Sequence, residues 1–348
     1  KIFVITGKKS YFLSGAKKIF DPLLKGKKTQ IFFKSSPYPE INELKKLILL
    51  IKKFQPDLIL AIGGGSVIDY AKMANLDGIY ENLEKKIKEN SYNIKKKIAK
   101  IIAIPTTAGS GAEVTANAVI YINKIKYSME GKELKPFSYF LIPSLIITNK
   151  KKLKSSAGFD AISQAIESLI SVKSTQKSIL FSEKSLKMSL KNYINFIKKP
   201  NFENCSKMSL AAMYSGKAIS ITKTTAPHAL SYPFTALFNI SHGHAVSLTL
   251  EKFLKFNYLN SKKSVSNFNL KNRYEKIFDI FKVNNIFELE NYIKNLKKNS
   301  GLEDNFGKLK INLNRDFNKI IKGVNSLRLK NNPVRINKAD IKTILLKC

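Results

Sequence analysis

The sequence predicts an α/β domain of residues 1–150 followed by an all-helical domain of residues 151–348. In the first part, short apolar runs alternate with stretches of helical periodicity, a pattern typical of a parallel sheet with helical crossovers. The run DLILAI at 57–62 is continuously apolar after Asp57, which indicates a strand buried on both faces. Beyond residue 151, apolar residues recur at helical spacing and no convincing buried strand follows. A chain of 348 residues is also long for one domain.

Each element of the first domain can be predicted in turn. Strands are expected at residues 2–6, 29–34, 57–62 and 99–105, with helices over 10–20 and 41–54. Residues 76–98 are rich in lysine and asparagine and are expected to form a surface excursion. Residues 117–122 and 124–129 are expected to pair as a hairpin with its turn near Asn123. In the second domain, helices are predicted over 157–171, 182–199, 207–220 and most segments after 251.

The net charge of +36 suggests nucleic-acid binding, but the composition does not support it. Only four of the 61 basic residues are arginine, the side chain that best reads phosphate and guanine. The lysines are spread along the chain instead of lying in one stripe. We therefore expect no nucleic-acid partner, although a basic surface favours an anionic substrate.

The apolar runs and the cysteines also indicate where the protein works. No run of eighteen apolar residues is present, so no membrane span is expected. The first residues lack the features of a signal peptide. Cys205 and Cys348 are too few and too far apart for a disulfide framework or a CxxC site. A cytoplasmic protein is expected.

The segment IGGGSVIDYAK at 62–72 follows a predicted strand and opens a predicted helix. Its three glycines let the backbone approach a phosphate, and the helix N-terminus supplies amide donors. A tight strand-to-helix turn needs glycine too, so this alternative stays open. Ser66 fits either a helix cap or a phosphate contact. The GxGxxG fingerprint is absent.

A second small-residue loop, IPTTAGSGAEVT at 104–115, follows the fourth predicted strand. Its small residues and hydroxyls suit a backbone wrapped around a polar ligand. They suit equally well a turn whose hydroxyls bond its own backbone.

All three histidines, His228, His242 and His244, fall within seventeen residues. Imidazole is the commonest metal ligand, so the cluster indicates a metal site. Asp160, at the expected start of an apolar helix, is the best charged ligand, with a plain helix cap as its alternative. Gln164 shares its helix face, and Glu167 continues that face to support the ligands or to pack.

Taken together, these motifs resemble the iron-containing alcohol dehydrogenases, whose relatives include glycerol dehydrogenase and dehydroquinate synthase. The resemblance runs in order along nearly the whole chain. It rests on GGGSVID, PTTAGSGAEVT, KYS at 126–128, AGFDAISQAIES, HALSYPFTALFNISHGHAV and NPVRINKADI at 332–341. It implies a Rossmann-like nucleotide-binding domain followed by an all-helical, metal-binding domain of the dehydroquinate synthase-like fold.

The resemblance also implies roles for particular residues. Cofactor contacts are implied for Gly7, Gly63, Gly64, Gly65, Ser66, Asp69, Thr106, Thr107, Ser110 and Lys126. The catalytic metal, Fe²⁺ or Zn²⁺, would be held at Asp160, Gln164, His228 and His242. Gln164 stands where the family has a histidine. Its neutral carbonyl has three open roles: coordinating weakly, holding a water, or not binding.

Two neighbouring positions also bear on the site. Tyr232 stands where many members carry another histidine, which leaves a proton relay there in doubt. His244 matches no ligand position, and its open roles are support of the ligands, a substrate-side role and a plain surface role.

Within the family, FDAISQAIES, SVKST, KTTAPHALSYP and SHGHAV are most similar to the hydroxyethylphosphonate dehydrogenases. This similarity implies reduction of phosphonoacetaldehyde to 2-hydroxyethylphosphonate. Lys223, five residues before His228, would reach the phosphonate if its segment were helical, and is otherwise one more solvated lysine. Hydride would come from the nicotinamide, the metal would act as a Lewis acid, and the proton would come from water or a ribose hydroxyl.

The end of the first strand bears on the choice of cofactor. Gly7 stands where NAD-using members carry an aspartate, and Lys8 and Lys9 follow it, so NADPH is favoured and NADH remains possible. A homodimer is expected. Alternative readings are a dehydrogenase of an ordinary alcohol, polyol or glycerol phosphate, a dehydroquinate-synthase-like lyase, and a non-catalytic binding protein.

Overall fold

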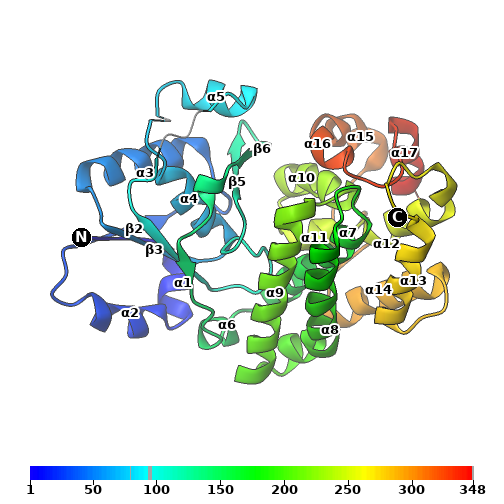
Figure 1. Ribbon diagram of the computed structural model, residues 1–348, viewed down its shortest axis with the longest axis horizontal. Coiled ribbons are helices and arrows are strands. Elements are labelled where there is room, and N and C mark those ends of the chain that lie inside the picture. Colours follow the sequence, from blue (N-terminus) through cyan, green and yellow to red (C-terminus); the bar gives the residue numbers. More distant parts are fainter. Residues whose placement is uncertain (79, 93–95, 347–348) are drawn as a thin grey trace.

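The computed structural model describes residues 1–78, 80–92 and 96–346. Its first part is built on a five-stranded parallel sheet in the order β2-β1-β3-β4-β7 (Figure 1). The strands are β1 (Ile2–Gly7), β2 (Thr29–Lys34), β3 (Leu58–Gly63), β4 (Lys100–Pro105) and β7 (Ser138–Tyr139). The chain goes from β1 to β2 on one side and to β3 on the other. Their carboxyl ends therefore flank the switch point where parallel sheets bind ligands.

Helices cover both faces of this sheet because side chains alternate along each strand. Val4 and Leu60 belong to the core beneath α1 (Lys8–Leu13), α2 (Ala16–Leu24) and α6 (Ser144–Ile147). Phe3 and Ile59 belong to the core beneath α3 (Ile41–Phe54) and α4 (Gly65–Ala74). Burial on both faces explains the continuous apolar runs of the sequence.

The four predicted strands are confirmed, and so is the hairpin. It comprises β5 (Asn117–Ile122) and β6 (Ile125–Glu130), which are antiparallel. The single helix expected over 10–20 is wrong, because Gly15 adopts a left-handed φ of 88° and separates α1 from α2. The excursion at 76–98 contains α5 (Leu83–Glu89), and residues 79 and 93–95 of it lie outside the described residues.

Among the described residues, everything after Lys150 is helical or irregular. The helices are α7 (Lys151–Ile170), α8 (Gln176–Lys198), α9 (Phe202–Thr222), α10 (Ala226–Phe238), α11 (His242–Ser247), α12 (Leu250–Leu259), α13 (Leu270–Phe281), α14 (Ile286–Ser300), α15 (Leu313–Lys322), α16 (Ser326–Leu329) and α17 (Lys338–Leu346). The predicted fold, an α/β domain followed by a helical domain, is confirmed. The division near residue 150 stays a prediction. No described helix is both long and apolar enough to span a bilayer.

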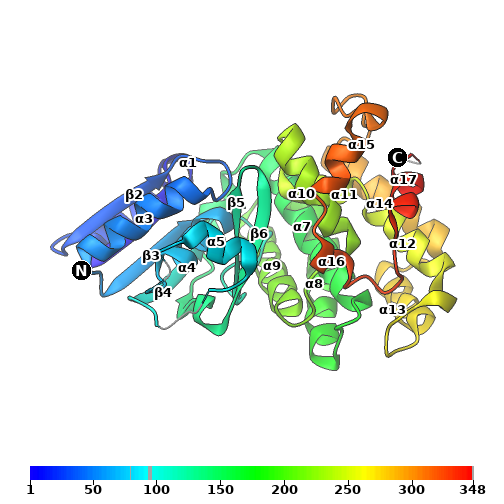
Figure 2. The same ribbon diagram turned by 90° about the horizontal axis from the view of Figure 1, so that it is seen from above.

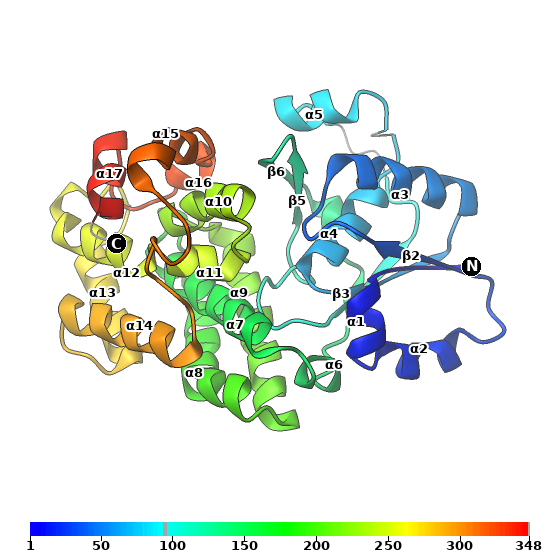
Figure 3. The same ribbon diagram turned by 180° about the vertical axis from the view of Figure 1, so that it is seen from behind.

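The two halves stand side by side, with the hairpin of β5 and β6 facing the helical half (Figure 2). Seen from behind, α7, α9 and α10 are the helices nearest the sheet domain (Figure 3). One contact between the halves is backbone against backbone: a Cβ built on Gly216 of α9 would lie 2.7 Å from the Cα of Gly111, in the loop after β4. Two glycines therefore fix how closely the halves approach here.

Candidate metal and cofactor site

The buried helix α7 carries the acidic side of the site. It begins at Lys151, so Asp160 lies within the helix and the expected helix start at this residue is wrong. The cap alternative for Asp160 is therefore excluded. Asp160, Gln164 and Glu167 follow one another along one helix face and are all buried. A polar face inside a packed core needs partners, and α10 and α11 provide them.

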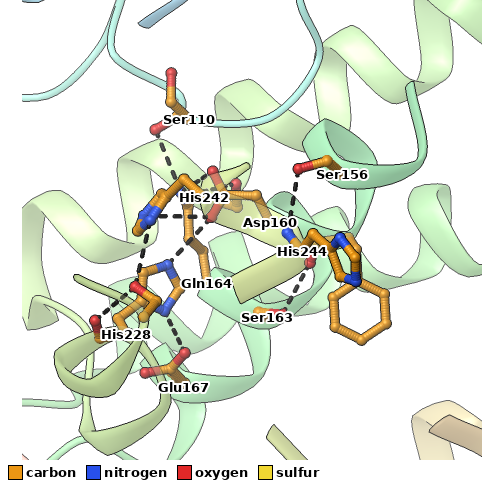
Figure 4. Close-up of polar contacts among 12 residues, drawn as sticks. Ser110, Ser156, Asp160, Ser163, Gln164, Glu167, His228, His242 and His244 are labelled. Atoms are coloured by element: carbon orange, nitrogen blue, oxygen red, sulfur yellow. Dashed lines mark hydrogen bonds and ion pairs between the residues drawn. The ribbon is translucent and has the colours of Figure 1, made fainter. Parts of the chain in front are cut away.

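The side chains of Asp160, His228 and His242 converge on one point (Figure 4). One ligand atom from each lies within 4.8 Å of the others. The Nε2 atom of His228 lies 3.2 Å from Oδ1 of Asp160, and Nε2 of His242 lies 4.0 Å from the same oxygen. Among the described residues, this is the one group of histidine, cysteine or carboxylate side chains with such a spacing.

Glu167 orients His228. One carboxylate oxygen contacts Nδ1 of His228, and the other accepts hydrogen bonds from the amide and hydroxyl of Thr225, at 2.6 and 2.8 Å. Burial lowers the pKa of His228, but Glu167 and Asp160 outweigh burial and raise it to about 10. Without a metal, His228 therefore carries two ring protons between two carboxylates. Nδ1–H stays with Glu167, and Nε2 is the atom available to a metal.

Ser231 fixes the tautomer of His242 in a similar way. Its hydroxyl donates to the carbonyl of His228 at 2.7 Å and lies 3.3 Å from Nδ1 of His242. A hydroxyl has one proton to donate, so here it accepts from Nδ1–H. Burial, together with the charge of Lys126, places the pKa of His242 well below its usual value. The ring is neutral, with the lone pair of Nε2 facing Asp160.

Gly243 lets α11 pack against α7 closely enough to bring His242 to Asp160. A Cβ on Gly243 would collide with the carbonyl of Ser156 and would lie 2.8 Å from Cβ of Asp160. No other residue type fits without moving α11. The glycine between the two histidines of the SHGH motif is therefore part of how the site is assembled.

The donor set fits a divalent transition metal. Burial raises the pKa of Asp160, but the hydrogen bond from His228 and the nearby cationic charges lower it overall, so the carboxyl is ionised. One carboxylate and two imidazole nitrogens suit Fe²⁺ or Zn²⁺ and leave open positions.

Gln164 supports Asp160 in this arrangement. Its amide nitrogen lies 3.2 Å from Oδ2 of Asp160, and its carbonyl accepts from the hydroxyl of Ser215 at 2.9 Å. Ligation by Gln164 would require the amide to turn over, and it stays a prediction.

His244 points away from this group. It is buried, which excludes the plain surface role, and its Nε2 lies 2.6 Å from the carbonyl of Glu303. Its amide donates to Ser156 at 3.1 Å. These contacts tie α11 to the loop after α14 and to α7, and they place no atom of His244 in the candidate metal group.

Two cavities, to both of which α4 and the loop after β4 contribute, are lined by most of the residues predicted to bind the cofactor. The first, which we call the sheet-edge cleft, has a volume of about 820 Å³. It lies at the carboxyl ends of β1, β3 and β4, and five predicted residues line it: Gly7, Gly64, Ser66, Thr106 and Thr107. Gly64 is the N-cap of α4, so Ser66 is not the cap and faces the cleft in the first helical turn.

The second cavity, the inner recess, has a volume of about 110 Å³. It is lined by Asp160, His228 and His242, the candidate metal ligands, and by three further predicted residues, Asp69, Ser110 and Lys126. Gly63 and Gly65 lie in the backbone between the cavities. A Cβ on Gly65 would meet Oγ of Ser110 at 2.6 Å, which shows how closely the two small-residue loops pack.

Three more side chains complete the recess. The Nζ atom of Lys126 lies 3.7 Å from the ring centroid of Tyr232, whose ring also packs against His242. Lys223 lines the recess although its segment is not helical, since α9 ends at Thr222. Arg328 of α16 also lines it. Sequence reasoning missed Arg328, and its rarity as one of four arginines was the available signal.

Comparison with known proteins agrees with this geometry. The family profile "Iron-containing alcohol dehydrogenase" matches residues 1–150, and "Fe-containing alcohol dehydrogenase family, C-terminal" matches residues 154–348. The chain belongs to the iron-containing alcohol dehydrogenase family, an oxidoreductase family. The family predicted from the sequence motifs is therefore confirmed.

Individual relatives are more distant. The chain is 28% identical to aldehyde-alcohol dehydrogenase 2 of Entamoeba histolytica over 74% of its own length and 31% of that protein. It is 28% identical to phosphonoacetaldehyde reductase of Streptomyces viridochromogenes, over 60% of this chain and 55% of that one. The chain thus spans about a third to about half of these curated relatives. Sulfoacetaldehyde reductase from Bifidobacterium kashiwanohense in complex with NAD+ superposes with a TM-score of 0.86 at 25% identity, covering 100% of this chain and 90% of that one.

Proposed function

We propose that the protein is a metal-dependent reductase that transfers hydride from a reduced nicotinamide to a small aldehyde bearing an anionic group, phosphonoacetaldehyde in the first instance. One observation carries the proposal: the ligand atoms of Asp160, His228 and His242 converge in a recess that is lined in part by α4 and the loop after β4, the same two segments that help to line the sheet-edge cleft. A homodimer remains part of the proposal.

Different residues of the chain bind the cofactor, hold the metal and orient the metal ligands in this proposal. The first turn of α4 offers backbone amides to the cofactor phosphates at the carboxyl edge of the sheet. Asp160, His228 and His242 hold the metal, and Glu167 and Ser231 keep both rings in the required tautomer. When bound, the metal supplies positive charge for the developing alkoxide, and the nicotinamide supplies hydride. The proton comes from water, because both imidazoles are committed and Asp160 is ionised.

The size and charge of the inner recess support a small anionic substrate. A volume of about 110 Å³ suits an aldehyde of a few carbons. Lys126, Lys223 and Arg328 all line it and provide charge for an anion. Two of the similar proteins are, by name, reductases of two-carbon aldehydes with a tetrahedral anionic group.

The same reasoning supports NADPH as the favoured cofactor, with NADH possible. Lys8, Lys9 and Lys34 line the sheet-edge cleft around Gly7, where no carboxylate is present to bond a ribose 2′-hydroxyl. Burial lowers the pKa of Lys34, although Glu43 offsets part of that effect. The charged side chains that line this end of the cleft are all cationic, whereas the carboxylate of Glu43 contacts the cleft-lining Ser35 and Ser36.

The test is oxidation of NADPH and of NADH with phosphonoacetaldehyde, sulfoacetaldehyde and propanal, using metal-loaded and chelated protein. We expect metal-dependent turnover with a preference for an anionic aldehyde. Turnover of propanal alone would favour an ordinary alcohol dehydrogenase. Tight metal binding without turnover of any aldehyde would contradict the proposal.

A further inference from the structure

A second, larger cavity meets the inner recess at three cationic side chains. This outer basin, of about 770 Å³, lies between the β5–β6 hairpin with α5 on one side and α16 with its preceding turn on the other. Lys126, Lys223 and Arg328 line both cavities and so stand at the boundary between them. A substrate entering from the basin passes these three side chains before it reaches the metal ligands.

One carboxylate is shared by two of these cations. Oε2 of Glu130 lies 3.1 Å from Nζ of Lys223, and Oε1 lies 3.2 Å from a guanidinium nitrogen of Arg328. The cationic side chains are largely enclosed, with exposed fractions of 19% and 11%, whereas the side chain of Glu130 is 44% exposed. Burial raises the pKa of Glu130, but Lys223, Arg328 and Lys173 lower it overall, so it is ionised. More positive charge is enclosed here than Glu130 neutralises.

The backbone at Lys223 adopts a strained conformation, which holds the side chain in place. Its φ of 61° and ψ of −179° fall in a region populated almost entirely by glycine. The strained turn is fixed by Asn331, whose amide donates to the carbonyls of Thr222 and Thr224 at 2.7 and 2.9 Å. A plain solvated lysine would not require this conformation. The strain aims Lys223 at the boundary of the recess.

We propose that Lys223 and Arg328 form the seat for the anionic end of the substrate, and that Glu130 occupies this seat in the free protein and yields it when substrate binds. The seat takes a tetrahedral oxyanion, phosphonate or sulfonate, with the aldehyde directed to the metal ligands. Glu130 thereby competes with the substrate anion for Lys223 and Arg328, so an anion binds only if it displaces the Glu130 carboxylate. The inference rests on the proposed function for the identity of the reacting group.

The charge arrangement predicts opposite effects for the two kinds of substitution. Removing a seat cation removes a charge-assisted hydrogen bond, so Arg328→Gln and Lys223→Gln lower the kcat/KM ratio of phosphonoacetaldehyde over propanal about 10- to 100-fold. Glu130→Gln frees the seat and raises this ratio about three- to tenfold. Lys207→Gln, a change of an exposed lysine on α9, controls for the loss of one positive charge.

A binding measurement separates the seat from the reaction. Methylphosphonate and methanesulfonate, which have no aldehyde, are titrated calorimetrically into the metal-loaded protein and each variant. We expect tighter binding by Glu130→Gln and weaker binding by Arg328→Gln, with the affinities of the two probes showing which oxyanion the seat prefers. Equal affinity in all variants, or weaker binding by Glu130→Gln, would overturn the seat.

The two proposals fail in different ways. If the affinities of the variants for the probes follow the expected order but no aldehyde is reduced, the anion-binding seat is supported and the proposed function is contradicted. If aldehydes are reduced but neither substrate selectivity nor probe affinity changes in the three variants, the anion-binding seat is contradicted and the proposed function is supported. Lys223→Gly serves as a second variant where Lys223→Gln folds poorly, since glycine removes the backbone strain.

Discussion

Glu167 contacts Nδ1 of His228 while Nε2 of the same ring faces Asp160. The carboxylate therefore sets the tautomer and orientation of a proposed metal ligand without belonging to the proposed ligand group. Carboxylate–histidine–metal arrangements of this kind raise the basicity of the ligand. The geometry explains why an acid is buried on α7 with no lysine or arginine beside it.

Substituting Glu167 should therefore weaken metal binding without removing a ligand. Glu167→Gln leaves a neutral amide at Nδ1, and we expect about 10- to 100-fold lower metal affinity. Competition with a coloured chelator measures this. Glu183→Gln, which loses only a surface contact with Lys276, is the matched control and should bind metal as the unaltered protein does. Unchanged affinity in Glu167→Gln would show that the orienting contact is dispensable.

Metal affinity should also depend on pH in a predictable direction. In the metal-free protein the pKa of His228 is about 10, so at neutral pH a metal must displace the proton on Nε2. Raising the pH weakens this competition, and affinity should rise about tenfold per unit from about pH 7 to about pH 9. His242 does not contribute to the pH dependence in this range, because its pKa lies well below its usual value and its ring is already neutral. Calorimetry in buffers of different ionisation enthalpy should show about one proton released per metal. A flat profile would contradict a protonated His228.

How much of this site the sequence could predict depends on how local each interaction is. His228 and His242 were predicted as ligands because all three histidines of the chain cluster within seventeen residues, and Asp160 because it is an acid in an otherwise apolar helix. For Glu167 the sequence left support of the ligands and packing open, and the orienting role of Ser231 requires knowing that α10 and α11 pack together, which no local pattern encodes. Arg328 and Glu130 are 198 positions apart, and only the folded chain brings them to one another.

The fold shows the same limit. Strands buried on both faces leave continuous apolar runs, so four of them were predicted within a residue or two. The break between α1 and α2 depends on the left-handed conformation of Gly15, and helical periodicity continues through it. The two-residue strand β7 is too short to carry any periodicity.

Gly243 should tolerate no side chain. Gly243→Ala places a methyl group against the carbonyl of Ser156, so α11 must shift away from α7. We expect about 1–3 kcal/mol of lost unfolding free energy and reduced metal content, because His242 moves with α11. Chemical denaturation and elemental analysis measure these. Gly307→Ala, whose methyl meets only the side chain of Asn305, is the control. Full metal content in Gly243→Ala would mean that α11 can shift without moving its ligand.

Cofactor preference should reverse when a carboxylate is restored at the end of β1. Gly7 has a φ of −94°, and an added Cβ meets only the rotatable hydroxyl of Ser10 and the end of Lys34, so Gly7→Asp is sterically acceptable. The new charge should repel a 2′-phosphate and bond a ribose hydroxyl, lowering the NADPH-to-NADH ratio of kcat/KM at least about tenfold. Lys18→Gln, which makes the same change of one charge unit at an exposed position on α2, should leave the ratio unaltered. A ratio that does not move in Gly7→Asp would place the 2′-position elsewhere.

The strain at Lys223 predicts an inverted order of stability. Glycine is normally less stabilising than alanine, but at a φ of 61° and ψ of −179° alanine keeps the strain and glycine removes it. Lys223→Gly should exceed Lys223→Ala in unfolding free energy by about 1 kcal/mol or more. Comparing the two variants cancels the lost ion pair with Glu130, since neither can form it. The usual order, with alanine more stable, would mean that the turn relaxes freely.

The glycine pair at the junction of the two halves affects how the two halves are positioned relative to each other. Gly111 belongs to the loop that follows β4, and Gly216 belongs to the helix that leads to Lys223. Because these two backbones pack against each other, the halves approach more closely at this junction than a side chain would allow. The distance between a cofactor bound by the first half and a metal bound by the second would therefore depend on this contact, together with the packing of β6 against α10 and of α6 against α9. A methyl group on either glycine would force the two halves apart at this contact. The nicotinamide and the aldehyde that accepts its hydride would then be misaligned, although the residues that bind each of them would be unchanged.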